Sequence, residues 1–344
     1  MSTIKAIYKF AIMLAIILPL VFVTACGDFE EEDPTPNSAI AFGIRHDRNL
    51  ADYEEVATNA APYNTADYPD FSAVVHFAYS VDDSGDEYVA SGVLVSPEWI
   101  LTAGHNFFDA ADQEAPAAVN LIDVNIGADP NSPASTVAVE QLVFHPTWIN
   151  QSEVIVYAND LCLVKLSTPL AGVTPATINE STGEPIGNVS WFCGYGDYSS
   201  QAGQDPDLFS KRHAVSNILD RKVSEIVSRT INNTIYNGGL VAFDFDSPDG
   251  LINAFGDDFT SEDEPLLGGG DSDATALEFE GTTVEGDSGG PLFVKMNNEW
   301  RVIGILSGGA NEPIPNHRDG SYGDISVFTR VSTAADWIDS VINP

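Results

Sequence analysis

Apolar residues along most of this chain occur in short continuous or alternating runs, and Gly, Pro, Asn and Asp separate these runs. Such runs are typical of β-strands joined by turns. They begin at Phe71–Phe77, continue through 88–105 and 118–166, and resume at 188–196 and 291–331. The pattern therefore predicts an all-β protein built as a barrel or a sandwich.

Two segments have helical rather than strand-like patterns. Ala51–Ala61 is acidic with interspersed apolar residues, and Ala334–Ile342 is amphipathic with a helical period. We therefore expect a helix near the start of the folded region and another at the C-terminus. Asn297 and Asn298 lie between two apolar runs, which predicts a β-hairpin with a tight turn.

The first residues have the pattern of an export signal. Lys5 and Lys9 precede an apolar run, Phe10–Val23, which is too short to span a membrane. Small residues then precede Cys26, as in the lipobox of bacterial lipoproteins, so we expect Cys26 to be lipidated and to become the first mature residue. Ordinary cleavage near Ala25, with an unmodified cysteine, is the alternative.

The chain is therefore expected to have three parts: a signal peptide with a lipobox at 1–26, an acidic disordered linker at 27–39, and one folded domain at 40–344. A lipid on the first mature residue would anchor the protein in a membrane. The predicted location is that of an exported bacterial lipoprotein, on the periplasmic side or on the cell surface.

The charge of the chain is strongly negative. Asp and Glu number 51 against 14 Lys and Arg, which gives a formal net charge of -37. This charge favours solubility and repels nucleic acid, so we expect no nucleic-acid partner and a monomer. The stretch 243–280 has no Lys, Arg or His, and we interpret it as a solvated acidic loop. Ca²⁺ bound within 244–280 is the alternative, and we expect no other metal or cofactor.

Three motifs have residue types suited to nucleophilic catalysis. Ser288 lies in Gly-Asp-Ser-Gly-Gly-Pro, where a tight turn can expose its hydroxyl and the N–H groups of Gly286 and Ser288 can face one developing negative charge. His105 ends the run WILTAGH, and Asp160 begins the run DLCLVKL. A serine becomes a nucleophile when a neighbouring histidine takes its proton and a carboxylate orients that histidine.

The chain order of these motifs resembles that of the trypsin/chymotrypsin-like serine endopeptidases, from about residue 70 to the C-terminus. The resemblance implies two six-stranded antiparallel β-barrels, over about 70–170 and 185–335, with a C-terminal helix. It implies that His105, Asp160 and Ser288 hydrolyse peptide bonds in protein or peptide substrates through an acyl-enzyme. The expected activity rises with pH through about 6.5–7, because the histidine must be neutral.

The resemblance also assigns the pocket for the substrate side chain, to Thr282, Ser307, Gly308, Gly309 and Ser326. Thr282 stands where trypsins have an acid, so we expect an uncharged, medium or large side chain in this pocket. Acidic residues nearby would restore a basic preference if they reached it, namely Glu278, Glu280 or Glu285.

In this family the aspartate before the catalytic serine pairs with an ammonium group that cleavage of the chain creates. Asp287 has that position here, but no Lys or Arg lies between the lipobox and Ile40. A buried carboxylate needs a partner. We expect an internal cation, Arg45 or Arg48, to pair with Asp287 without cleavage; cleavage near Ile40 or Ile44 is the alternative.

The cysteines differ from those of the family. Asn106, rather than a cysteine, follows His105. Cys162 and Cys193 lie in apolar runs of different halves, and we expect buried thiols there rather than a disulfide.

A second function is possible for such a chain. A protease-like fold without activity can serve as a surface binding module. Such proteins usually lose a catalytic residue or the oxyanion glycine, whereas this chain retains His105, Asp160, Ser288 and Gly286.

Overall fold

The computed structural model describes residues 42–81, 87–108, 116–149, 159–198, 210–223, 229–231, 234–236, 239–256, 272–311 and 319–344. The expected signal peptide, the lipidation site at Cys26 and the linker at 27–39 lie outside the described residues. None of the helices within these described ranges is long and apolar enough to cross a membrane.

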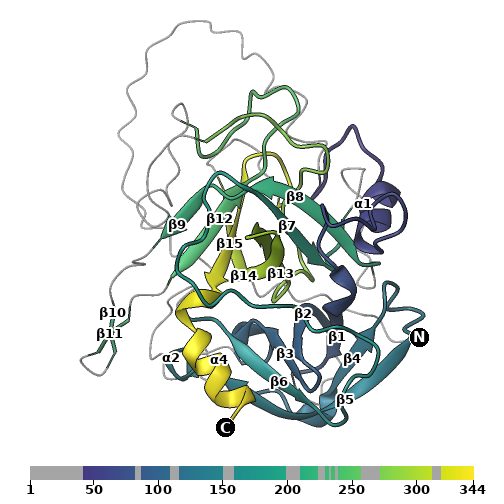
Figure 1. Cartoon of the computed structure of the whole chain (residues 1–344), viewed down its shortest axis with the longest axis vertical. Coiled ribbons are helices and arrows are strands. Elements are labelled where there is room, and N and C mark those ends of the chain that lie inside the picture. The colour runs from purple at the N-terminus through teal and green to yellow at the C-terminus, as the bar shows by residue number, and fades with distance from the viewer. Residues whose placement is uncertain are drawn as a thin grey trace, which may run out of the picture.

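Six antiparallel strands in the first half form a closed barrel in the order β1-β2-β3-β6-β5-β4 (Figure 1). They are β1 (Val74–Tyr79), β2 (Tyr88–Ser96), β3 (Trp99–Thr102), β4 (Ile122–Ile126), β5 (Ser135–Phe144) and β6 (Cys162–Leu166). β1, β3 and β6 are almost entirely buried. Burial on both faces explains why their sequences are continuous apolar runs rather than alternating ones.

The second half forms a curled sheet of seven strands in the order β8-β7-β13-β14-β15-β12-β9. They are β7 (Val189–Gly194), β8 (His213–Ile218), β9 (Arg221–Val223), β12 (Leu240–Asp244), β13 (Pro291–Met296), β14 (Glu299–Asn311) and β15 (Asp324–Arg330). A small separate hairpin pairs β10 (Arg229–Ile231) with β11 (Thr234–Tyr236).

The second barrel of the predicted fold is a strongly curled half-barrel of seven strands. The two edges of the sheet, β8 and β9, are consecutive in the chain, and only Leu219 and Asp220 separate them. Leu219 is fully buried, and the Asp220 N–H donates to Ala242 O at 3.1 Å. The chain passes at these two residues from one edge of the sheet to the other, and one barrel-closing strand is divided into two edge strands.

The helices are short: α1 (Leu50–Ala57), α2 (Pro146–Ile149), α4 (Ala335–Ile342), and the 3₁₀ turns η1 (Phe71–Ala73), η2 (Gly104–Asn106), η3 (Val119–Leu121) and η4 (Val331–Thr333). The predicted C-terminal helix is confirmed as α4, which buries Ile338 and returns to the first barrel, where Trp337 packs on the ring of His145 (Figure 1). The predicted hairpin turn is also confirmed, because Asn297 and Asn298 have φ of 51° and 64°.

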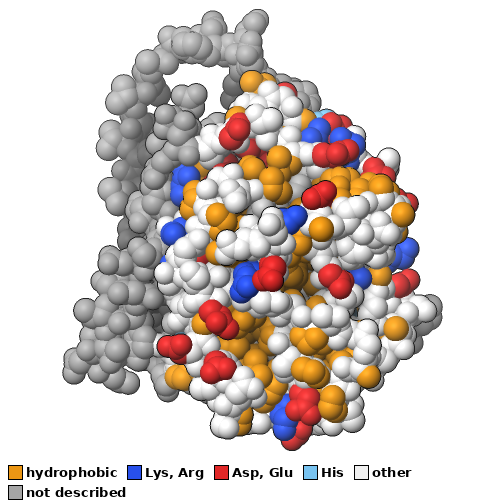
Figure 2. Space-filling view, in the orientation of Figure 1, with side chains coloured by type: hydrophobic (Ala, Val, Ile, Leu, Met, Phe, Trp, Pro, Cys, Tyr) orange, Lys and Arg blue, Asp and Glu red, His pale blue; other side chains and the backbone are white. Residues whose placement is uncertain are grey.

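One large apolar core extends through both halves, and two smaller apolar clusters lie in the second half. At their junction the ring of Phe71 contacts Trp191 and Phe293, with centroids 6.1 Å and 5.8 Å away. Cys162 and Cys193 are buried free thiols, as expected, and burial raises the pKa of both. On the face shown in Figure 2, acidic and basic side chains are interspersed, with apolar side chains between them.

Candidate active site

His105 and Asp160 lie at the ends of two adjacent strands of the first barrel. Thr102 at the end of β3 pairs with Cys162 at the start of β6, so the residues that follow and precede these strands emerge together. His105 Nδ1 lies 2.6 Å from Asp160 Oδ2, and the His105 N–H donates to Asp160 Oδ1 at 2.8 Å. The carboxylate therefore fixes both the backbone and the ring of His105, and it directs Nδ1 of the ring toward Asp160.

The carboxylate of Asp160 is itself held by both halves of the molecule. Ser307 on β14 donates its hydroxyl to Asp160 Oδ2 at 2.6 Å. Asn159, with φ of 50°, makes the turn that precedes the carboxylate, and asparagine tolerates this left-handed conformation. Only 2% of the Asp160 side chain is exposed, against 31% for His105. The histidine thus faces solvent, and its orienting carboxylate does not.

Ser288 lies in a turn whose two glycines have left-handed backbones. Gly286 has φ of 93° and Gly289 has φ of 84°, a conformation that costs side-chain-bearing residues energy. A Cβ on Gly289 would also overlap the hydroxyl of Thr102. The positive φ at both positions and the lack of space at Gly289 explain the glycines of the motif. Ser288 is half-buried beside the first barrel.

The backbone N–H groups of this turn fall into two sets. Those of Asp287, Gly289 and Gly290 donate to carbonyl oxygens at 2.8–3.1 Å. Those of Gly286 and Ser288, the predicted oxyanion hole, have no acceptor among the described residues. Two such donors beside a nucleophile are what stabilisation of an oxyanion requires.

Asp287 is fully buried, and its partners are neutral donors. Its Oδ1 accepts from Gly196 N at 2.8 Å, and its Oδ2 accepts from the Tyr198 hydroxyl at 2.6 Å and Val284 N at 3.0 Å. Burial raises the pKa of Asp287 to about 7, and the three donors only partly offset it. His213 Nε2 lies 3.7 Å from Oδ1, but burial lowers the pKa of His213 to about 3, so this ring is neutral.

The prediction that Arg45 or Arg48 pairs with Asp287 is therefore wrong. Arg45 pairs with Asp47 at 2.7 Å, and Arg48 pairs with Glu278 at 3.3 Å. Tyr198, which binds Asp287 instead, had no signal in the sequence beyond its place shortly after the Gly-Tyr-Gly that begins at the last residue of β7.

Three of the predicted substrate-pocket residues, Thr282, Gly309 and Ser326, lie beside one another, whereas Gly308 pairs with Val327 on β15. Thr282 Oγ1 and Thr283 Oγ1 each lie 2.9 Å from Ser326 Oγ, and Gly309 faces Ser326 across the β14–β15 ladder. Ser307 turns away from this hydroxyl cluster toward Asp160. Thr283 was missed by sequence reasoning, although it is adjacent to Thr282.

The acids considered for this pocket have other partners. Glu280 is 1% exposed and accepts from the N–H groups of Asp246, at 3.0 Å, and Leu277. Burial raises the pKa of Glu280 to about 8. Glu278 binds Arg48, as noted, and Glu285 is exposed.

Further buried acids lie near Glu280. Burial raises the pKa of Asp220 to about 9 and of Asp246 to about 10, and it also raises the pKa of Asp244. Within the described residues, no group of three or more His, Cys, Asp or Glu side chains has the arrangement of a metal site. Residues 257–271 of the acidic stretch, where Ca²⁺ was the alternative, lie outside the description.

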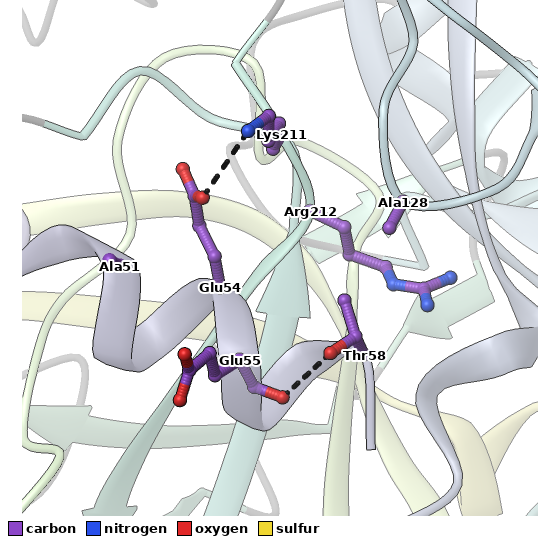
Figure 3. A pocket seen from close by; sticks show the side chains of 7 residues that line it. All are labelled: Ala51, Glu54, Glu55, Thr58, Ala128, Lys211 and Arg212. Carbon is purple, nitrogen blue, oxygen red and sulfur yellow. Dashed lines mark hydrogen bonds and ion pairs between the residues drawn. The ribbon is translucent and has the colours of Figure 1, made fainter. Parts of the chain in front are cut away.

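A shallow cavity of about 260 Å³ lies apart from all these residues, between α1 and the chain that enters β8 (Figure 3). Its lining is Ala51, Glu54, Glu55, Thr58, Ala128, Lys211 and Arg212. Glu54 and Lys211 lie 3.7 Å apart as an ion pair. The lining includes none of the residues predicted above as nucleophile, base or substrate pocket.

A closed barrel beside a curled antiparallel sheet, with a histidine and an aspartate on the first and a Gly-flanked serine on the second, defines a chymotrypsin-like fold. The trypsin-like peptidase domain family matches residues 90–305, and the chain therefore belongs to this family. The chain is also similar to the tryptase of Mus musculus, with 24% identity over 263 residues, which cover 73% of this chain and 77% of the tryptase. The expected fold class and family are thus confirmed.

Proposed function

We propose that the protein is a serine endopeptidase in which His105, Asp160 and Ser288 form the catalytic triad. The observation that carries the proposal is the contact of 2.6 Å between His105 Nδ1 and Asp160 Oδ2, in a chain of the trypsin-like peptidase family. An Nδ1–H donated to a carboxylate leaves Nε2 as the basic nitrogen of the ring, which is the form that a general base needs.

In this mechanism Ser288 Oγ attacks the scissile carbonyl carbon while His105 takes the hydroxyl proton. The carbonyl oxygen becomes an oxyanion, and it accepts hydrogen bonds from Gly286 N and Ser288 N. His105 then gives the proton to the leaving amine as the C–N bond breaks. Water, deprotonated by His105, hydrolyses the acyl-enzyme and returns Ser288 to its initial state.

The hydroxyl cluster of Thr282, Thr283 and Ser326 supports an uncharged substrate side chain. These hydroxyl groups are neutral, and Glu280, one of the acids considered for this pocket, is buried against backbone N–H groups. A cationic side chain would lose its hydration without gaining a counter-charge there. The preferred protein or peptide substrates would therefore carry a neutral residue before the scissile bond.

The proposed location is a membrane surface. The apolar segment and the lipobox ending at Cys26 support an exported lipoprotein, and the acidic linker would hold the peptidase domain away from the bilayer. We place the protein on the periplasmic side or the outside of a bacterial membrane, as a monomer.

The test is labelling of the membrane-extracted protein with a fluorophosphonate probe, followed by intact mass measurement and peptide mapping. Labelling at Ser288, absent from the Ser288→Ala and His105→Ala variants, is the expected result. A folded wild-type protein that takes up no label would refute the proposal and favour the binding module instead. The same mass spectrum reports whether the chain begins at a lipidated Cys26.

A further inference from the structure

The carbonyl oxygen of Ser288 accepts two hydrogen bonds from the first barrel. The N–H of Ser91 on β2 lies 2.9 Å away, and Nδ2 of Asn106 lies 3.1 Å away. At the other end of the same peptide, the Gly289 N–H donates to Leu306 O on β14 at 2.9 Å. The Ser288–Gly289 peptide is thus held on both sides, which fixes the direction in which the Ser288 side chain leaves the backbone.

The Asn106 side chain is itself held in one orientation. It is 4% exposed, and its Nδ2 also lies 3.1 Å from Thr102 Oγ1 on β3. The Thr102 hydroxyl donates in turn to Ser91 O at 2.7 Å. Both hydrogens of the Asn106 amide are therefore directed to fixed acceptors, one in the barrel that carries His105 and one in the turn that carries Ser288.

We propose that Asn106 is a positioning residue for the peptidase reaction. Asn106 directly follows His105 in the chain, and its side-chain amide fixes the position of the Ser288 peptide relative to His105. This inference rests on the proposed function. Transfer of a proton from Ser288 to His105 requires hydrogen-bond reach between them, and a displacement of about 1 Å can lower a rate ~100-fold. One of the two donors to the Ser288 carbonyl therefore belongs to the residue next to the base, and this contact links the position of the nucleophile to that of His105.

Loss of the Asn106 amide is expected to shift the turn rather than detach it. Ser91 retains two contacts to the turn, because its N–H binds Ser288 O and its hydroxyl donates to Gly286 O at 3.0 Å. Variants at position 106 should therefore fold, and their effect should appear in the chemical step rather than in substrate binding.

The test compares Asn106→Leu, which removes the donor at similar volume, and Asn106→Asp, which replaces it by an acceptor. The matched control is Asn125→Leu on β4, where a buried asparagine of the same barrel binds Thr136 and His76. Active sites are counted by fluorophosphonate titration, and kcat and KM are measured per active site on a chromogenic peptide amide. We expect kcat to fall ~10–100-fold in both Asn106 variants, with KM within about twofold, and no change in the control.

Two results would overturn the positioning role. One is an unchanged kcat per active site in Asn106→Leu. The other is a decrease only in the number of titratable sites, because a purely structural residue would change how many molecules are active and not how fast each one reacts. A wild-type protein without any label is distinguishable from both, since it refutes the proposed function and this inference together.

Discussion

The contribution of the buried hydrogen bond between Tyr198 and Asp287 to the free energy of unfolding should depend on pH. The native pKa of Asp287, about 7, lies above its ordinary value of 3.8. The folded state therefore binds this proton more tightly than the unfolded state, and the resulting stabilisation is present in acid and lost as pH rises from about 4 through about 7. Three pKa units correspond to about 4 kcal/mol of unfolding free energy.

Tyr198→Phe removes the hydroxyl that lies 2.6 Å from the carboxylate. Above pH 7 that hydroxyl donates to an ion, a contact worth about 2–3 kcal/mol, whereas below pH 6 its partner is neutral and the contact is worth about 1 kcal/mol. We therefore expect the variant to lose about 1–2 kcal/mol more at pH 9 than at pH 5, because the substitution raises the pKa of Asp287 further.

The assay is urea unfolding at the two pH values, followed by fluorescence. Tyr53→Phe is the control, because this fully buried hydroxyl donates to a backbone carbonyl, Glu280 O, at 3.0 Å. The control should lose similar stability at both pH values. If Tyr198→Phe behaved in the same way as the control, then Asp287 would not change its charge in this range and the reasoning would be refuted.

Three further predictions follow from single contacts. Ser307→Ala removes one donor to Asp160 and should lower kcat by about tenfold with little change in KM, measured as initial rates per active site. Gly289→Ala should lower the unfolding free energy by more than ~2 kcal/mol in urea, or prevent folding, because its φ is positive and a Cβ meets β3. Cys162 and Cys193 should react with iodoacetamide only after denaturation, and native labelling monitored by mass would contradict their burial.

The sequence predicted the strands, the C-terminal helix and the chain order of the three motifs, because these depend on local patterns. The period of apolar residues identifies a strand, and Gly286 and Gly289 around Ser288 identify a turn with a left-handed backbone. Each of these patterns lies within about ten residues, so it can be recognised without knowledge of the rest of the fold.

The Tyr198 partner of Asp287 and the Asn106 partner of the Ser288 carbonyl were not predictable, because these contacts join residues distant in the chain. Tyr198 and Asp287 are separated by 89 positions, and Asn106 and Ser288 by 182. Charge complementarity suggested an arginine as the partner of Asp287. Burial of an ion pair carries a large desolvation free energy, which the neutral tyrosine hydroxyl and two N–H donors avoid. The division of the closing strand at Leu219 and Asp220 was not predictable either, because no glycine or proline indicates it.

The buried acids of the second half change what the protein releases when it unfolds. Asp220, Asp246 and Glu280 have pKa values of about 8 to 10, so at pH 7 each retains a proton in the native state. The folded chain is therefore less anionic than its formal charge of -37, and unfolding at pH 7 would release protons to the solution. The calorimetric heat of unfolding should then differ between buffers in proportion to their enthalpies of ionisation.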